Sequence, residues 1–132
     1  MGEKKILIVD DDADVRLGLR ARLTANHYHV LLASDGMSGI AEARKHLPDL
    51  VILDLGLPAG DGFSVLERLK VNQSLSSIPV IVLSARDPVG NSERALKAGA
   101  SMFLQKPMKN DNLLSVIRMV LNGPHAQRQK TQ

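Results

Sequence analysis

The feature that most constrains the fold is a short apolar run that ends in a carboxylate. Residues 50–53 read Leu-Val-Ile-Leu, and Asp54 follows them directly before the chain turns through Gly56 and Pro58. An unbroken run this short, rich in branched side chains, predicts a strand that is buried on both faces. Such strands belong to parallel sheets covered by helices, which bind ligands at the carboxyl ends of their strands. Asp54 is therefore expected at a ligand-binding edge.

Four further apolar segments alternate with helical patterns. The pattern predicts strands at residues 5–9, 29–33, 78–83 and 101–104, and the segment after each strand repeats its apolar residues at helical spacing. This alternation predicts an α/β fold. Right-handed crossovers favour a flavodoxin-like (βα)5 doubly wound, five-stranded parallel sheet with strand order 2-1-3-4-5.

Length and composition indicate one domain. We expect a domain at residues 1–122 and a disordered tail or the start of a linker at residues 123–132, which lack apolar periodicity. The absence of cysteine excludes disulfides and thiolate metal sites. With neither a signal peptide nor an apolar run of about 20 residues, a cytoplasmic protein without membrane contact is expected. Two charges of the net +3 come from Arg128 and Lys130 in the tail, so direct nucleic-acid binding is not expected.

Polar side chains follow four of the predicted strands. Asp10 and Asp11 come after the first strand, Asp54 after the third, Ser84 after the fourth and Lys106 after the fifth. Each one alone is explained by turn formation or solvation. Because these four strands are neighbours in the predicted order, however, their carboxyl ends should form one pocket.

The residue types in this pocket favour phosphoryl chemistry. Three adjacent carboxylates repel one another unless a cation holds them. Oxygen ligands without Cys or His favour a hard divalent ion, and Mg²⁺ fits best. Lys106 and the Ser84 hydroxyl would bind phosphoryl oxygens, which leaves Asp54, at the centre of the sheet, as the best candidate nucleophile.

Five segments in order resemble the receiver domain of two-component response regulators. They are ILIVDDD, DLVILDLGLPAGDG, VIVLSA, ALKAGA and FLQKP, and the resemblance extends from residue 5 to about residue 122. It implies that Asp54 is a phosphoacceptor, which takes a phosphoryl group from the phosphohistidine of a sensor histidine kinase or phosphotransfer protein. The chain would then catalyse only its own phosphorylation and dephosphorylation.

The resemblance also implies roles for the other residues of the pocket. Asp10 and Asp11 would hold Mg²⁺ together with Asp54 and the backbone carbonyl of Gly56. Lys106 would pair with the phosphoryl group, and the Lys106–Pro107 bond would be cis. Ser84 and Phe103 would form the switch, because the rotamer of Phe103 follows the movement of the Ser84 hydroxyl.

Some positions depart from the common family pattern. Phe103 replaces a frequent tyrosine and so lacks a hydroxyl, while Ser84 stands where threonine is commoner. The resemblance implies that Gly56 and Arg86 occupy positions that tune hydrolysis of the aspartyl phosphate, and we expect Arg86→Ala to change its lifetime by at least a few-fold.

The resemblance also implies that the fourth helix, fifth strand and fifth helix form the face that signals to a downstream partner or output domain. Met102 and Val116 stand where receivers of winged-helix transcription factors usually pair charges. This argues against that dimer mode and leaves a phosphorylation-dependent homodimer open.

Two other function classes share parts of this residue pattern. A haloacid dehalogenase-like phosphohydrolase would use Asp10 as its nucleophile, but it needs further acids after the lysine, and only Asp111 follows Lys106. A flavin-binding flavodoxin would place a phosphate in the first loop, which here is rich in aspartate.

Overall fold

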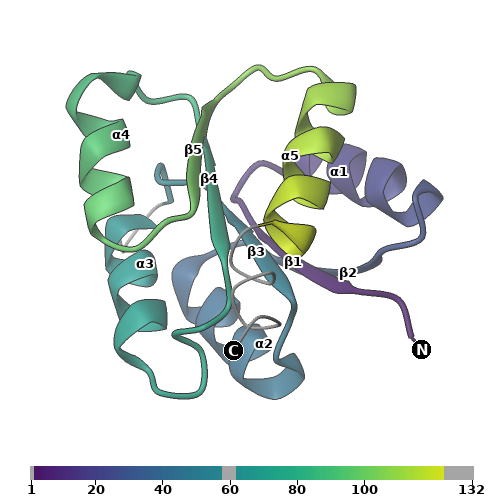
Figure 1. Cartoon of the computed structure of the whole chain (residues 1–132), viewed down its shortest axis with the longest axis horizontal. Coiled ribbons are helices and arrows are strands. Elements are labelled where there is room, and N and C mark those ends of the chain that lie inside the picture. Colours follow the sequence, from purple (N-terminus) through teal and green to yellow (C-terminus); the bar gives the residue numbers. More distant parts are fainter. Residues whose placement is uncertain (1, 58–61, 124–132) are drawn as a thin grey trace.

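Five parallel strands alternate with five helices in the computed structural model, which describes residues 2–57 and 62–123 (Figure 1). The strands are β1 (Lys5–Val9), β2 (His29–Ala33), β3 (Leu50–Leu53), β4 (Val80–Ser84) and β5 (Met102–Gln105). The helices are α1 (Ala13–Ala25), α2 (Gly36–His46), α3 (Gly62–Val71), α4 (Pro88–Lys97) and α5 (Asn110–Asn122).

The sheet has the predicted strand order, β2-β1-β3-β4-β5. All four residues of β3 are buried, as expected for a central strand covered on both faces. In the register, Leu53 lies opposite Val9 of β1 and Val82 of β4. The residue after β3 is therefore in the middle of the carboxyl edge.

Helices cover both faces of the sheet. Leu7 and Val9 of β1 pack with Ile40 of α2 and Leu66 of α3 in one core cluster, while Ile8 packs in a second cluster with α1 and α5 residues. Figure 1 shows α1 and α5 on the side of the sheet opposite α3 and α4. Because successive side chains along a strand point to opposite faces of the sheet, each strand contributes residues to both clusters.

The structure refines the predicted element boundaries. β4 begins at Val80, two residues later than predicted, because the Ile78 N–H donates to the Leu75 carbonyl (3.0 Å) in the preceding turn and Pro79 has no N–H to donate. β5 likewise begins at Met102 and ends at Gln105.

Helix termini follow from local polar residues. Asp12 caps α1, since its carboxylate accepts hydrogen bonds from the N–H groups of Asp14 (2.8 Å) and Val15 (3.3 Å). In α4, Val89 and Gly90 have non-helical backbone angles, and Gly90 has a φ of 79°. Regular helix therefore starts after Gly90.

Two further expectations concern the Lys106–Pro107 peptide bond and membrane-spanning helices. The Lys106–Pro107 bond is cis, as the resemblance implied. No helix within residues 2–57 and 62–123 has the length and hydropathy needed to span a bilayer. Residues 124–132 of the predicted tail lie outside the described residues.

Candidate functional site

Backbone hydrogen bonds that continue the sheet just past the strand ends fix the backbone of two predicted site residues. The Asp54 N–H donates to the Val9 carbonyl (3.0 Å), and the Lys106 N–H donates to the Ser84 carbonyl (2.8 Å). Each residue is thus anchored to the neighbouring strand just past the end of its own. This anchoring places their side chains at one edge of the sheet.

Three carboxylates converge at this edge. One oxygen from each of Asp10, Asp11 and Asp54 lies within 4.8 Å of the others. The Asp10 and Asp54 residues are only 3% and 8% exposed, whereas Asp11 is exposed. The predicted acid cluster is therefore assembled, with Asp11 on its solvent side.

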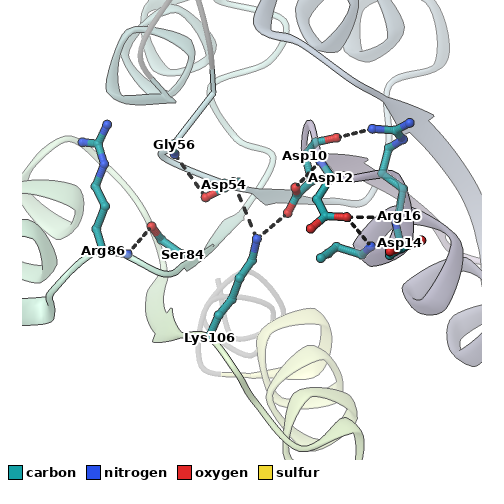
Figure 2. Close-up of polar contacts among 10 residues, drawn as sticks. Asp10, Asp12, Asp14, Arg16, Asp54, Gly56, Ser84, Arg86 and Lys106 are labelled. Atoms are coloured by element: carbon teal, nitrogen blue, oxygen red, sulfur yellow. Dashed lines mark hydrogen bonds and ion pairs between the residues drawn. The ribbon is translucent and has the colours of Figure 1, made fainter.

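Lys106 bridges the two buried carboxylates (Figure 2). Its Nζ lies 2.8 Å from Asp10 Oδ2 and 3.6 Å from Asp54 Oδ2. Burial by itself would lower the pKa of Lys106, but the hydrogen bond and charge of Asp10, with a contribution from Asp54, outweigh burial and raise it. Lys106 is therefore an ammonium ion at neutral pH.

Ionisation of Asp10 carries an energetic cost in the folded state. Burial raises the pKa of Asp10 above its usual value of 3.8, and the hydrogen bond from Lys106 only partly offsets this. Between the usual pKa and the raised one, the folded state binds more protons than the unfolded state. The stability of the fold therefore decreases as the pH rises through this interval, and the loss persists at neutral pH.

Asp10→Asn is consequently expected to stabilise the protein in the absence of divalent cations, by about 1 kcal/mol or a few degrees in Tm. Mg²⁺ should raise the Tm of the wild type and leave that of the variant unchanged. Thermal melts at pH 7 with and without Mg²⁺ check both points. A variant that is less stable than the wild type without Mg²⁺ would refute the electrostatic explanation.

The donor set fits a hard cation. All ligand atoms in the cluster are carboxylate oxygens, which suit Mg²⁺ better than softer metals. The backbone of Gly56 lies next to this acid cluster, since its N–H donates to Asp54 Oδ1 (3.1 Å). A Cβ at position 56 would lie 3.7 Å from both Asp54 carboxylate oxygens, so this position does face the candidate nucleophile.

Ser84 is completely buried, and its Oγ accepts a hydrogen bond from the backbone N–H of Arg86 (3.1 Å). Figure 2 shows the Arg86 side chain extending away from the Ser84 hydroxyl. The Arg86 guanidinium carbon is 5.8 Å from the centre of the Phe63 ring, at the start of α3. Phe103, the predicted switch residue, is partly buried and packs against the core cluster that contains α3 and α4 residues.

Two contacts were not predicted from the sequence. Arg16 of α1 donates a hydrogen bond to the backbone carbonyl of Asp10 (2.8 Å). Arg94 of α4 lies over the Phe63 ring, with its guanidinium carbon 3.7 Å from the ring centre. Both arginines read in the sequence as ordinary charged residues on a helix surface, so no sequence signal singles them out.

Comparisons with known proteins agree on one family. The sequence model described as "Response regulator receiver domain" matches residues 6–118. Over 115 residues the chain is 43% identical to the response regulator PleD of Caulobacter vibrioides, which covers 86% of this chain and 25% of PleD. Over 113 residues it is 41% identical to the transcriptional regulatory protein KdpE of Mycobacterium tuberculosis, covering 86% of this chain and 49% of KdpE. The chain thus spans half or less of these relatives.

Solved structures show the same fold. A CheY-like receiver domain protein from Methanospirillum hungatei superposes with a TM-score of 0.88 and 27% identity, over 99% of this chain and all of that chain. The receiver domain of the sensor histidine kinase PA1611 from Pseudomonas aeruginosa, whose structure has a magnesium ion in the active-site cleft, gives a TM-score of 0.84 and 27% identity, over 92% of this chain and all of that chain.

The receiver family model and the receiver structures match this chain across both the sheet and the acid cluster. The phosphohydrolase alternative therefore has no support. The fold, the strand order and the family match all agree with the predicted architecture. The chain belongs to the family of response regulator receiver domains.

Proposed function

We propose that Asp54 accepts a phosphoryl group from a phosphohistidine and that this modification switches the domain. The observation that carries the proposal is the position of Asp54: its nearly buried carboxylate lies within the acid cluster and 3.6 Å from the Lys106 ammonium. A carboxylate oxygen of Asp54 attacks phosphorus, the P–N bond to the imidazole breaks, and its electron pair stays on the imidazole nitrogen.

The other residues stabilise the charge that develops on the phosphoryl oxygens. Lys106 supplies a fixed ammonium, and we assign to Ser84 a hydrogen bond to a phosphoryl oxygen once its hydroxyl turns toward Asp54. We propose that Asp10, Asp11, Asp54 and the carbonyl of Gly56 hold Mg²⁺. When bound there, the ion neutralises charge on the phosphoryl oxygens.

The output face is proposed to comprise α4, β5 and α5, with Phe103 of β5 reporting the state of Ser84. Met102 and Val116 are partly buried and pack against the second core cluster. Their burial supports the expectation that this face does not use the charge pairs of winged-helix regulators. We take residues 1–122 as the receiver and residues 123–132 as a tail or linker to an output partner.

A groove beside the site is proposed to receive the phosphodonor protein, a sensor histidine kinase or phosphotransfer protein. It has a volume of about 310 Å³ and is lined by α1 residues and by the segment after β5, including Lys106 and Met108. Because Lys106 also contacts the acid cluster, a partner helix in this groove would lie next to Asp54.

Gly18 gives a steric test of this docking. It lines the groove, and a Cβ at this position would meet nothing within 4 Å, so a larger side chain fits the folded chain. Gly18→Leu should slow phosphotransfer from the kinase at least about tenfold by blocking the partner. It should leave phosphorylation by acetyl phosphate, a small donor, unchanged. Ala21→Leu on the exposed side of α1 is the matched control, and equal slowing by both variants would contradict the placement.

The aspartyl-phosphate lifetime is expected to depend on Arg86. The residue lies two positions beyond Ser84, and its backbone holds the Ser84 hydroxyl. Arg86→Ala should change the decay rate at least a few-fold, because in this family the side chain two residues beyond the hydroxyl residue tunes attack by water on the aspartyl phosphate. Measurement of the decay of the phosphorylated form after removal of donor, with Lys97→Ala as a control on the same side of the sheet, tests this. An unaltered rate would refute it.

The proposed function is tested by incubation with acetyl phosphate and Mg²⁺, with the wild type beside Asp54→Ala. The wild type should gain one acid-labile, hydroxylamine-sensitive phosphoryl group, and the variant none. An acid-stable, hydroxylamine-resistant label, or a label that survives in the variant, would overturn the mechanism.

A further inference from the structure

Arg16 reaches from the first turns of α1 to the end of β1. Its Nη1 donates a hydrogen bond to the carbonyl oxygen of Asp10 (2.8 Å), and the residue is partly buried (Figure 2). The helix that carries it is tied to the same loop, because the Arg16 N–H donates to the Asp12 carbonyl (3.0 Å) and Asp12 caps α1. Arg16 is therefore tied to this loop twice, through its guanidinium at Asp10 and through its backbone N–H at Asp12.

With this contact, every polar group of Asp10 has a partner. Its N–H donates to the Ala33 carbonyl (3.1 Å), Oδ1 accepts from the Asp12 N–H (2.9 Å), and Oδ2 accepts from Lys106 Nζ (2.8 Å). The carbonyl bound by Arg16 belongs to the peptide group between Asp10 and Asp11. The orientation of this peptide determines where the chain of Asp11 leaves, and hence where its carboxylate lies.

We propose that Arg16 is a positioning residue, which fixes the Asp10–Asp11 peptide so that both carboxylates converge with Asp54 on one cation. This inference rests on the proposed function, because it concerns the metal site of the phosphoacceptor. Arg16 touches neither a ligand oxygen nor Asp54 in the described structure; it acts through the Asp10 backbone. Partners of metal ligands that fix ligand orientation commonly contribute about 10-fold or more to affinity.

Simple electrostatics predicts the opposite effect. A guanidinium close to the cluster repels a divalent cation, so its removal should strengthen Mg²⁺ binding if charge were its only role. Loss of orientation should instead weaken binding. The sign of the change in affinity therefore separates the two roles.

The experiment is a calorimetric titration of Mg²⁺ into the unphosphorylated wild type, Arg16→Met, Arg16→Lys and Arg20→Met. Methionine keeps the apolar stem but removes the donor and the charge, whereas lysine keeps the charge and a less well directed donor. Arg20 is an exposed arginine one helical turn further along α1 and serves as the matched control. We expect the Mg²⁺ dissociation constant to rise about tenfold in Arg16→Met, to rise less in Arg16→Lys, and to stay unchanged in Arg20→Met.

An Arg16→Met protein that binds Mg²⁺ as tightly as the wild type, or more tightly, overturns the proposal. A purely structural tie would lower the Tm without Mg²⁺ but leave the dissociation constant of the folded protein unchanged, which also overturns it. If Arg16→Met does not fold, an Arg16→Lys protein with wild-type affinity has the same consequence. A wild type that takes up no Mg²⁺ would instead overturn the metal site of the proposed function, so the two failures are distinguishable.

Discussion

Gly62→Ala is expected to destabilise the fold by at least about 3 kcal/mol, roughly 10 °C in Tm. Gly62 starts α3, and its N–H donates to the Leu55 carbonyl (3.1 Å). A Cβ at this position would collide with the Leu55 Cα and with the carbonyl oxygen of Asp54. Because these are backbone atoms next to the candidate phosphoacceptor, relief of the collision must move either α3 or the end of β3.

Two other helical glycines provide a graded control series. A Cβ on Gly18 would meet nothing within 4 Å, and Gly18→Ala should stabilise the protein by up to about 1 kcal/mol through helix propensity. A Cβ on Gly39 would lie 3.0 Å from both side-chain methyl groups of Val9, so Gly39→Ala should fall between the other two. Urea unfolding of the three variants measures the order. Equal stability of the Gly62→Ala and Gly18→Ala proteins would show that the start of α3 is not packed tightly against the backbone of Asp54 and Leu55.

Lys106→Met is expected to slow phosphorylation of Asp54 by acetyl phosphate about 100-fold or more. The variant removes the ammonium that lies 2.8 Å from Asp10 and 3.6 Å from Asp54, while the methionine keeps the apolar stem. It should also destabilise the fold by a few kcal/mol, because two buried carboxylates lose their compensating charge. Asp10→Asn is expected to have the opposite effect on stability, so the pair of variants distinguishes an electrostatic cause from loss of packing.

Single-turnover phosphorylation at saturating Mg²⁺, together with thermal melts, checks the Lys106 prediction. Lys97→Met is a suitable control, since Lys97 pairs only with Glu93 on the surface of α4 among the described ion pairs (3.1 Å). A Lys106→Met rate within about threefold of the wild type would exclude a role of the ammonium in phosphoryl transfer.

The fold and the acid cluster could be predicted because both depend on local patterns and one topological rule. Unbroken apolar runs identified the strands, and alternation with helices identified a parallel sheet. Once the strand order is known, residues that directly follow neighbouring strands must share an edge, which brings Asp10, Asp54 and Lys106 together. No knowledge of side-chain direction was needed for this step.

The remaining features depend on side-chain direction and on competition between neighbouring turns. The start of β4 was predicted too early because Ile78 is apolar, yet its N–H belongs to the preceding turn. The stacking of Arg94 on Phe63 and the bond from Arg16 to Asp10 join residues on different elements. Long charged side chains have many rotamers, so their partners follow from packing and not from sequence spacing.

The most direct test of the central claim is to locate the phosphoryl group itself. After reaction with acetyl phosphate and Mg²⁺, borohydride reduction converts an aspartyl phosphate into homoserine, which peptide mass spectrometry assigns to a position. We predict homoserine at position 54 alone, formed only when Mg²⁺ is present. Homoserine at position 10 or 11, or conversion at no aspartate of a phosphorylated sample, would contradict the assignment of Asp54 as the phosphoacceptor.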